Sequence, residues 1–333
     1  MLKKVEKTIA LAGLGNGIID IIVNVEESFL NDNKLQKGSM LLVNEEEQNN
    51  LISTLSSDYL QFACGGSVGN SIVTFSDLGL KTAWMTCVGD DDFSNMYVDE
   101  IGNFNITLNE NCRYSNSKIG TCLVMITPDS ERTMRTCLNV SSKISAEHIE
   151  ENIIKKSEWC FLEGYLLANP DYGHSAILKS IEYAKKYNTK LALTLSDAFV
   201  VNCFRDFIDS IIDSVDLIFA NEVEATTYTG EETAELASKA LNKIIPIAVV
   251  TASEKGSFIT QDHKTLHIPV IPCNPIDMTG AGDTYAAGFI YGQIMGYKLE
   301  QSAEIATNLA KEVITIIGAR LPKGKAAEIV ANI

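Results

Sequence analysis

The second half of the chain alternates short apolar runs with longer stretches in which apolar residues recur every three or four positions. Runs such as 191–195 (LALTL) and 215–220 (VDLIFA) are almost continuously apolar, as strands are when both faces of a parallel sheet are covered. The expected elements are helix 145–156, strand 158–163, helix 171–187, strand 190–195, helix 199–213, strand 215–220, helix 222–243, strand 246–251, hairpin 256–271, helix 283–296 and helix 300–317. This order predicts an α/β fold with a mostly parallel central sheet and helices on both faces.

The first half of the chain adds further strands and a region of a different kind. The apolar runs predict strands 8–13, 18–25, 38–43 and 81–88, a strand at 62–66, and a helix over about 67–78 that follows it directly. Residues 105–140 instead show short alternating runs, including a hairpin made by 120–127 and 132–138. We therefore expect a single domain over 1–333, with a small β lid formed by about 14–45 and 105–140.

Residues 277–283 combine two glycines with a carboxylate just before a helix of small residues. Gly280 and Gly282 let backbone N–H groups converge and let a ligand approach closely. The helix adds unpaired N-terminal donors and the positive end of its dipole, so the turn suits an anion. A carboxylate beside it, Asp283, suits phosphoryl transfer, in which an acceptor hydroxyl must be oriented or deprotonated. An ordinary glycine-rich helix start explains the same spacing equally well.

Composition narrows the classes of partner. The formal net charge of −16 argues against a nucleic-acid surface or an anionic membrane as the partner. No run of 18 apolar residues and no leader-like N-terminus occurs, so we expect a cytoplasmic protein. The eight cysteines form no C-x-x-C pair, which indicates reduced thiols rather than a disulfide framework or a zinc site.

The string Asp277-Met278-Thr279-Gly280-Ala281-Gly282-Asp283-Thr284 resembles the D-T-T-G-A-G-D-[ST] signature of the ribokinase-like (PfkB) carbohydrate and purine kinases, with Met278 in place of the usual Thr. The resemblance implies a ribokinase-like fold and transfer of the γ-phosphoryl group of ATP, with Mg²⁺, to an alcohol. Asp283 would then orient or deprotonate the acceptor hydroxyl. Backbone N–H groups around Gly280, Ala281 and Gly282 would stabilise the transferring charge. The carbonyls of Asp277 and Thr279 would be candidate ligands for K⁺.

Two further strings resemble the acceptor-binding motifs of this family. Asp20 follows a Gly-Asn pair and lies between isoleucines, where a lone carboxylate is costly unless something binds it. Gly65-Gly66-Ser67-Val68-Gly69-Asn70 resembles the family's G-G-x-x-x-N motif. The resemblance assigns Asp20 and Asn70 to hydroxyl groups of the acceptor and Gly66 to close backbone contact with it. An exposed strand acid and an ordinary strand-to-helix turn are the plainer interpretations.

The nucleotide-binding residues are expected in the second half of the chain. Asn221 and Glu224 match the family's N-x-x-E motif, so Glu224 would contribute to binding Mg²⁺ through water. Thr251 to Gly256 resembles T-x-G-x-x-G, although Ser253 replaces the first glycine. Asn308 would contact the adenine region. A routine helix start explains the N-x-x-E string when it is taken alone.

Arg132 and Arg135 are two of the few arginines, and both lie in the expected lid hairpin. A spacing of three along a strand places them on opposite faces, so only one of them can face the site. That arginine could reach the transferring phosphoryl group when the lid closes. A surface charge is an equally good interpretation for either.

Several details resemble the adenosine kinases within the family. They are the run 193–199 (LTLSDAF), the run 220–225 (ANEVEA) and Gly120-Thr121-Cys122. A purine would need apolar walls, for which the lid offers Cys122, Met125, Met134 and Leu138. These details favour adenosine, phosphorylated on its 5′-hydroxyl, as the acceptor. A sugar kinase of the ribokinase or fructokinase type and a non-catalytic nucleotide-binding protein are the alternatives.

Both a monomer and a homodimer fit a β lid. Finally, we expect the helix N-terminus to lower the pKa of Asp283.

Overall fold

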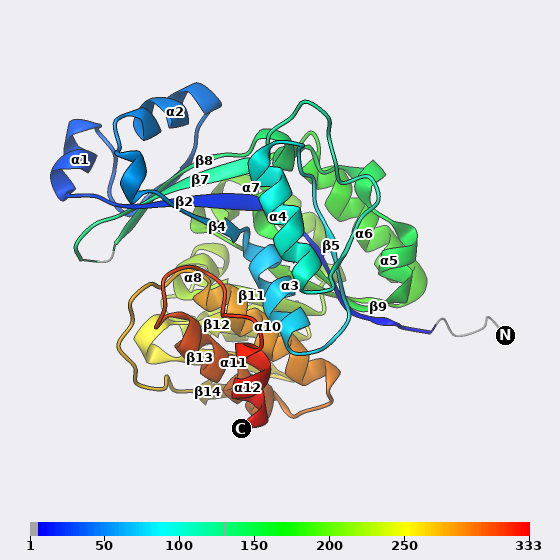
Figure 1. Ribbon diagram of the computed structural model, residues 1–333. Coiled ribbons are helices and arrows are strands. Elements are labelled where there is room, and N and C mark those ends of the chain that lie inside the picture. The colour runs from blue at the N-terminus through cyan, green and yellow to red at the C-terminus, as the bar shows by residue number, and fades with distance from the viewer. Residues whose placement is uncertain (1–5, 130) are drawn as a thin grey trace.

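The computed structural model describes residues 6–129 and 131–333, and at its centre lies a nine-stranded sheet (Figure 1). The strands in sheet order are β14 (Lys264–Ile268), β13 (Ser257–Gln261), β12 (Ile247–Thr251), β11 (Leu217–Asn221), β10 (Lys190–Thr194), β9 (Ser157–Glu163), β1 (Ile9–Leu14), β5 (Thr82–Met85) and β6 (Thr107–Leu108). The pairs are parallel from β6 to β12, and β13 and β14 add an antiparallel edge. The chain leaves β1 toward β5 on one side and later runs from β9 toward β12 on the other. The order therefore reverses between β1 and β9, the place where open α/β sheets bind ligands.

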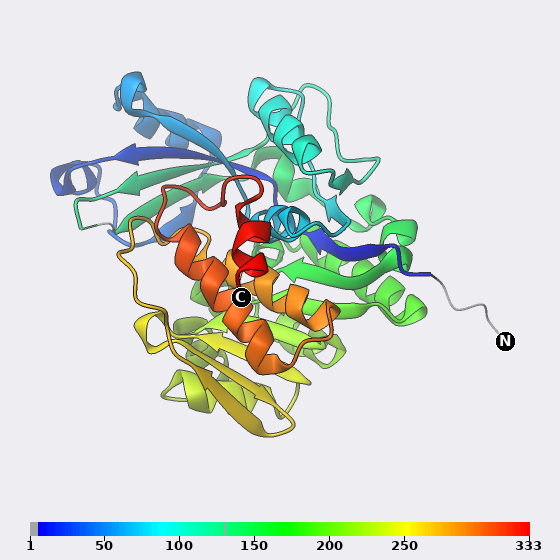
Figure 2. The same cartoon turned by 60° about the horizontal axis from the view of Figure 1, so that its bottom comes forward.

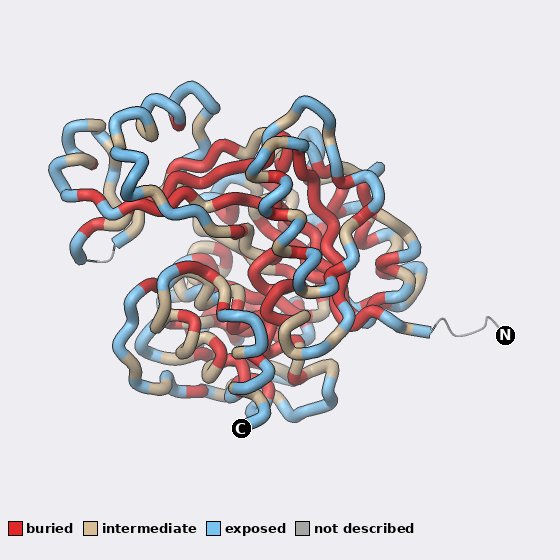
Figure 3. Tube along the Cα trace, in the orientation of Figure 1, coloured by how far each residue is buried: buried red, intermediate tan, exposed pale blue. Residues whose placement is uncertain are grey.

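Helices cover both faces of this sheet. The first face packs against α5 (Glu151–Lys156), α6 (Gly173–Tyr187), α7 (Ala198–Ile211), α8 (Glu222–Thr229) and α9 (Ala234–Leu241). The second face packs against α3 (Ser67–Asp77), α4 (Asp92–Asn103), α10 (Ala281–Ile294) and α11 (Leu299–Val313), and α12 (Lys325–Ala331) packs on α11 (Figure 2). Buried residues are concentrated along the strands, and the helices are exposed on their outer sides (Figure 3). This is the arrangement that the continuously apolar strands predicted.

A second sheet of five strands projects from the main body (Figure 1). Its order is β3 (Met40–Leu42), β8 (Arg132–Cys137), β7 (Gly120–Ile126), β2 (Ile18–Asn24) and β4 (Gln61–Gly65). One face carries an apolar cluster that α1 (Glu27–Asp32) and α2 (Glu45–Ser53) cover. The other face turns toward the main sheet. The predicted fold class, a mostly parallel α/β sheet with a small β lid, is confirmed.

Some element boundaries differ from those expected. The single helix expected over 222–243 is two helices, because Gly230 adopts a left-handed conformation with φ of 76° and Thr233 caps the next helix. The helix expected over 145–156 is a 3₁₀ turn, η3 (Ala146–His148), followed by α5. The helix expected over 300–317 ends at Val313, and α12 was not predicted. Residues 314–324, between α11 and α12, therefore lie outside both helices.

Membership of the two sheets also differs in detail from the expected ranges. β4 joins the lid sheet by pairing with β2, whereas β6, which falls within 105–140, pairs with β5 in the main sheet. Within the described residues, no helix combines the length and the apolar character needed to cross a membrane.

Candidate active site

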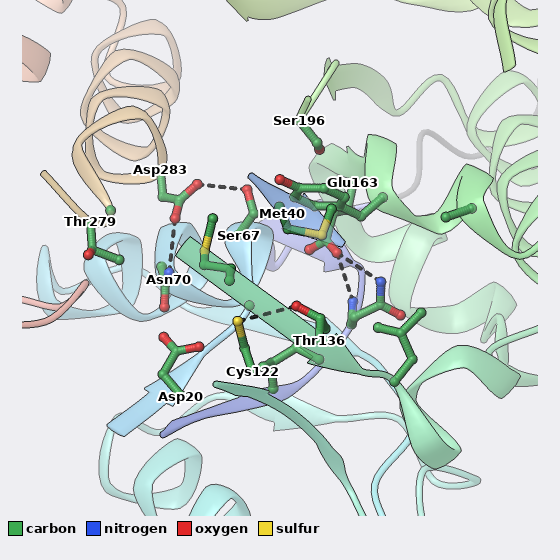
Figure 4. A pocket seen from close by; sticks show the side chains of 18 of the residues that line it. Asp20, Met40, Ser67, Asn70, Cys122, Thr136, Glu163, Ser196, Thr279 and Asp283 are labelled. Carbon is green, nitrogen blue, oxygen red and sulfur yellow. Dashed lines mark hydrogen bonds between the residues drawn. The ribbon is translucent and has the colours of Figure 1, made fainter. Parts of the chain in front are cut away.

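A pocket opens between the inner face of the lid and the reversal point of the main sheet (Figure 4). Its polar lining comes from the ends of elements that are far apart in the sequence. Asn16 follows β1, Glu163 ends β9, Ser67 begins α3 and Asp283 lies in the first turn of α10. Its apolar lining comes chiefly from the lid: Ile18, Met40, Leu42, Cys122, Met134 and Leu138. The pocket thus has a polar floor and an apolar roof.

Asp283 lies at the polar end of the pocket, held by two donors from α3 (Figure 4). The Ser67 hydroxyl donates to its Oδ1 at 2.7 Å, and the Asn70 side-chain amide donates to its Oδ2 at 2.9 Å. The hydroxyl of Ser71 also donates to the Asp283 backbone carbonyl at 2.8 Å. These bonds fix the carboxylate in one orientation at the start of α10.

The expectation that the helix N-terminus lowers the pKa of Asp283 is wrong. Burial raises this pKa above its ordinary value, and the bonds from Ser67 and Asn70 and the charges of Arg320 and Arg132 oppose the rise only in part. The helix dipole is outweighed because the carboxyl group lies under the lid, away from bulk water. A raised pKa makes the carboxylate a stronger base than an exposed aspartate.

The turn before α10 has the geometry of an anion cradle. Gly280 occupies the N-cap position with φ of 75°, and a Cβ there would lie 2.3 Å from the Ala319 carbonyl oxygen. Only glycine fits this position, and glycine has no side chain with which to cap the helix. A Cβ on Gly282 would meet nothing within 4 Å in the described structure. Among the described residues, the N–H groups of Gly282 and Asp283 have no hydrogen-bond partner, so the first turn of α10 presents free backbone donors.

Asp277 and Thr279 stabilise the same turn through hydrogen bonds. Asp277 Oδ1 accepts the backbone N–H of Thr279 at 2.9 Å, and its Oδ2 accepts that of Gly318 at 2.9 Å. Burial works to raise the pKa of Asp277, yet a hydrogen bond from the Thr279 hydroxyl, the two N–H bonds and the charge of Arg132 together bring it below its ordinary value. The Asp277 carboxylate is therefore ionised and stabilises the turn by accepting hydrogen bonds. Whether the carbonyls of Asp277 and Thr279 bind K⁺ stays a prediction.

Arg132 and Arg135 point to opposite faces of β8, as their spacing predicted. Arg132 lines the pocket, donates to the hydroxyl of Thr279 and lies 3.9 Å from Asp277 Oδ1. Arg135 is only 4% exposed and donates to the carbonyls of Ser39 and Met134. Arg132 is therefore the lid arginine beside the anion turn, and Arg135 is a packing residue of the lid.

The same alternation corrects one of the expected pocket walls. Cys122, Met134 and Leu138 line the pocket. Met125 does not, because its odd-numbered position in β7 places it on the other face, in the cluster under α1 and α2. The prediction that Met125 contributes to the pocket is wrong.

The expected acceptor-binding residues lie together in the pocket, with Gly66 and Asn70 at its floor and Asp20 on lid strand β2. Asp20 in β2 is half-buried in the pocket, and burial raises its pKa to about 7 against the opposing charge of Arg320. Gly66 has φ of 93°, and a Cβ there would lie 2.2 Å from the Asn16 carbonyl oxygen. Asn70 is 4% exposed. With Asp283, these residues offer both donors and acceptors to a hydroxylated ligand.

Sequence reasoning missed Glu163, which is 1% exposed and lines the pocket. Its oxygens accept the backbone N–H and the side-chain amide of Asn16, at 3.2 and 3.1 Å, and the N–H of Val68 at 3.1 Å. Burial raises the pKa of Glu163 to about 7. The available signal was an acid that directly follows four apolar residues at the end of a strand.

The expected nucleotide-binding residues lie outside this pocket. Asn221 caps α8 and shares a reciprocal capping box with Glu224, which is buried and whose pKa burial raises to about 7. Thr251 pairs with Asn221 across β11 and β12, so these three residues are neighbours. Gly256 has φ of 86° and closes the turn after Thr251.

Two positions in this region behave unexpectedly. Ser253, which replaces a glycine of the family motif, adopts a left-handed φ of 46° despite its side chain. Asn308 donates to the Glu304 carbonyl of its own helix, so its side-chain amide is used locally. The structure brings Asn221, Glu224 and Thr251 together, and the hydrogen bond given for the Asn308 side chain is to its own helix.

Comparison with known proteins places this geometry in context. The sequence profile of the pfkB family carbohydrate kinases matches residues 42–325. The adenosine kinase of Sinorhizobium meliloti superposes with a TM-score of 0.91 at 29% identity, covering 98% of this chain and 99% of that one. A probable sugar kinase of Rhizobium etli gives 0.92 at 28% identity, covering 98% and 100%. The guanosine-inosine kinase of Escherichia coli is 29% identical over 79% of this chain and 63% of its own length.

Proposed function

The chain belongs to the pfkB family of carbohydrate kinases, and we propose that it transfers the γ-phosphoryl group of ATP to the 5′-hydroxyl of a nucleoside, with adenosine as the preferred acceptor. The ribose would lie on the polar floor, where Asp20 and Asn70 bind its hydroxyls and Gly66 allows close backbone contact. Its 5′-hydroxyl would point to Asp283. The γ-phosphate would lie on the turn made by Gly280, Ala281 and Gly282.

The chemistry follows from these positions. The 5′-oxygen attacks the γ-phosphorus, the new O–P bond forms, and the bond to the β,γ-bridging oxygen breaks with its electron pair leaving on ADP. Asp283 orients the hydroxyl and takes its proton. The N–H groups at the start of α10 and the guanidinium of Arg132 stabilise the charge on the transferring group.

Mg²⁺ fits the nucleotide side of the site. Glu224 is buried beside Asn221 with a raised pKa, which a nearby cation would reverse. The described residues contain no group of three or more side chains that could hold a metal by themselves. Glu224 would therefore hold the ion through water, together with the ATP phosphates. When bound, Mg²⁺ neutralises phosphate charge.

The observation that carries the nucleoside assignment is the part of the pocket beyond the polar floor. The roof residues Met134 and Leu138 and the side chains of Tyr165 and Ala168 extend the lining past Glu163. Among the described residues, Asn16 Oδ1 and Ser196 Oγ are buried polar atoms without a hydrogen-bond partner. A flat, partly polar base would cover the apolar wall and pair with these atoms, whereas ribose alone would leave both atoms without a hydrogen-bond partner.

The covered lid favours a monomer. Helices α1 and α2 pack on the outer apolar face of the lid sheet, and the pocket occupies the inner face. A partner subunit would therefore find no bare apolar sheet face there among the described residues. We infer that the lid closes over its own subunit.

The test is ADP release from Mg-ATP with adenosine, inosine, guanosine, ribose and fructose as acceptors. We expect the highest kcat/KM with adenosine and a several-fold higher KM for adenosine in Leu138→Ala, because that variant removes part of the roof. Leu41→Ala, at a lid position that is 52% exposed and outside the pocket, is the matched control. Release with ribose or fructose alone would identify a sugar kinase instead. No release with any acceptor would contradict phosphoryl transfer to this class of molecule.

A further inference from the structure

Arg320 is a nearly buried cation that the proposed reaction does not use. Its side chain is 9% exposed, and it follows Gly318 and Ala319 in the segment released by the early end of α11. The guanidinium spans three partners. Nε donates to Asn70 Oδ1 at 2.9 Å, Nη2 donates to the Gly65 carbonyl at 3.0 Å, and Nη1 donates to Glu100 Oε1 at 2.6 Å.

Two of these partners are the ends of one functional turn. Gly65 ends β4, Asn70 lies in the second turn of α3, and Gly66 and Ser67 lie between them. Ser67 and Asn70 are the two side chains that donate to Asp283. Arg320 therefore holds both ends of the segment that fixes the carboxylate.

The hydrogen-bonding capacities leave Asn70 a single orientation. A guanidinium can only donate, and an ionised carboxylate can only accept. The amide of Asn70 lies between the two, so its oxygen must face Arg320 and its nitrogen must face Asp283. A flipped amide would place its NH₂ group against Arg320 and its oxygen against the Asp283 carboxylate, and both contacts would be repulsive.

We propose that Arg320 is a positioning residue for phosphoryl transfer. It fixes the orientation of the Asn70 amide, and through it the Asp283 carboxylate, while its bond to Glu100 anchors α4 to the same point. The inference rests on the proposed kinase activity. Because Arg320 acts chiefly through Asn70, its removal should cost most of the activity only while Asn70 is present.

The experiment is a double-mutant cycle with Arg320→Met and Asn70→Ala, measured as kcat and KM for adenosine and ATP. We expect Arg320→Met alone to lower kcat by about 10²-fold, as misplacement of a reacting group does, with KM for ATP changed less than about threefold. In the Asn70→Ala background the same change should lower kcat by less than about threefold. A full additional loss in that background would overturn the proposal, because Arg320 would then act independently of Asn70.

The variant Arg320→Lys separates the positive charge of Arg320 from its hydrogen-bond geometry. It also provides a test if Arg320→Met does not fold. A lysine keeps the cation but cannot donate to three partners at fixed angles, so kcat should remain low. Wild-type kcat in a folded Arg320→Lys variant would overturn the proposal. Arg205→Met, at a half-exposed arginine paired with Asp209 on the surface, removes the same charge and should leave the kinetics unchanged.

A second readout does not need turnover. In ¹⁵N-labelled protein, the Asn70 side-chain amide can be assigned by its loss in Asn70→Ser. Its two protons should be well separated and slow to exchange in the parent chain, and should exchange quickly in folded Arg320→Met. Unchanged amide resonances would overturn the proposal. If the parent chain phosphorylates no acceptor, the proposed function fails, and the amide readout still decides whether Arg320 orients Asn70.

The pH profile gives a third readout. Besides Arg320, the charged and titratable groups around Asp283 are Arg132, Asp20, Glu163, Glu224 and Tyr165. Loss of Arg320 removes a positive charge and loosens one hydrogen bond to the carboxylate, and both effects raise the pKa of Asp283. The acidic limb of kcat/KM should thus move to higher pH in Arg320→Met and less in Arg320→Lys. Identical limbs in both variants and the parent would contradict the positioning role.

Discussion

Helices α3 and α10 both begin at the floor of the pocket, and the two N-termini are treated differently. Each follows a glycine with positive φ, 93° at Gly66 and 75° at Gly280. At α3 the N–H of Val68 is bound by the carboxyl group of Glu163. At α10 the carboxylate of the first turn, Asp283, is turned away toward Ser67 and Asn70, and the N–H of Ala281 makes only a 3.4 Å contact with the Met278 carbonyl. One N-terminus carries its own acid, and the other is open.

We propose that this difference assigns the two helices to two different substrates. A helix N-terminus attracts anions unless an acid already occupies it. Glu163 at α3 and Asp20 beside it make that end suited to a neutral molecule with hydroxyl groups and, once ionised, repel phosphate. The open end of α10, with Arg132 beside it, suits the transferring phosphoryl group. In the proposed function, the pocket would therefore distinguish acceptor from donor by which helix N-terminus is already occupied by an acid.

The largest expected effect comes from removing the base at the junction of the two helices. Asp283→Asn should lower kcat by about 10²–10⁴-fold, because the amide cannot take the hydroxyl proton. Acceptor affinity, measured by calorimetry, should change far less, since Asp20 and Gly66 are intact. Asp92→Asn is the matched control, because Asp92 is the first-turn acid of α4 and lies on the surface. Full activity in Asp283→Asn would defeat the assignment.

A pair of glycine variants tests whether α10 is open and α3 is closed. Gly282→Ala places a methyl group where the described structure has open space, so the melting temperature should be unchanged. The methyl group would nevertheless displace the phosphoryl group, and kcat/KM for ATP should fall by about 10²-fold.

Gly66→Ala is the counterpart at α3. Its Cβ would lie 2.2 Å from the Asn16 carbonyl oxygen at a positive φ, so the free energy of unfolding should fall by about 1–3 kcal/mol. Thermal unfolding and steady-state kinetics on both variants separate the effects. Equal losses of stability in the two variants would show that the turn before α10 is as closed as that before α3.

Much of this arrangement could be predicted from local patterns, because the order of helices and strands along the chain, the parallel character of the sheet and the 277–284 motif can be read from neighbouring residues. Arg132 and Arg135 were also separable, since strand parity alone puts them on opposite faces. The same parity would have excluded Met125, which was chosen for its apolar character only. The local pattern marks Glu163 only as an acid that ends an apolar strand, and it gives no signal for Arg320. Their partners lie 95 to 255 positions away along the chain, so their roles depend on tertiary packing.

The pH dependence of activity depends on the acids at the N-termini of both α3 and α10. Asp283 must be ionised to take a proton, and its pKa is raised; Asp20 and Glu163 titrate near pH 7. A raised pKa keeps the proton bound at higher pH, so the acidic limb of kcat/KM should lie above the ordinary aspartate value of 3.8. The fall should approach tenfold per pH unit if one macroscopic ionisation governs it. An acidic limb at or below that ordinary value would contradict the raised pKa of Asp283.

The smallest expected effect comes from changing Glu163, whose carboxyl group binds the N-terminus of α3. In Glu163→Gln an NH₂ group replaces one acceptor and faces one of the N–H donors from Asn16 or Val68. Such a contact costs about 1–3 kcal/mol, which corresponds to a few degrees in melting temperature for a chain of this size. Surface variants such as Glu235→Gln, which removes only an exposed ion pair, should change it by much less.

The pH dependence of the stability lost in Glu163→Gln gives a further test of the difference between the N-termini of α3 and α10. The folded-state pKa of Glu163, about 7, lies above its ordinary value of 4.5, so the stability linked to this group is fully present below pH 4.5 and is lost as pH rises through 7. Glutamine does not titrate, while Asp20 and Glu224 titrate in both proteins and cancel. The difference in melting temperature between the parent chain and Glu163→Gln should therefore shrink between pH 5.5 and pH 8. A difference that widens with pH would mean that α3 binds the ionised carboxylate tightly, as a helix N-terminus binds phosphate, and the contrast with α10 would disappear.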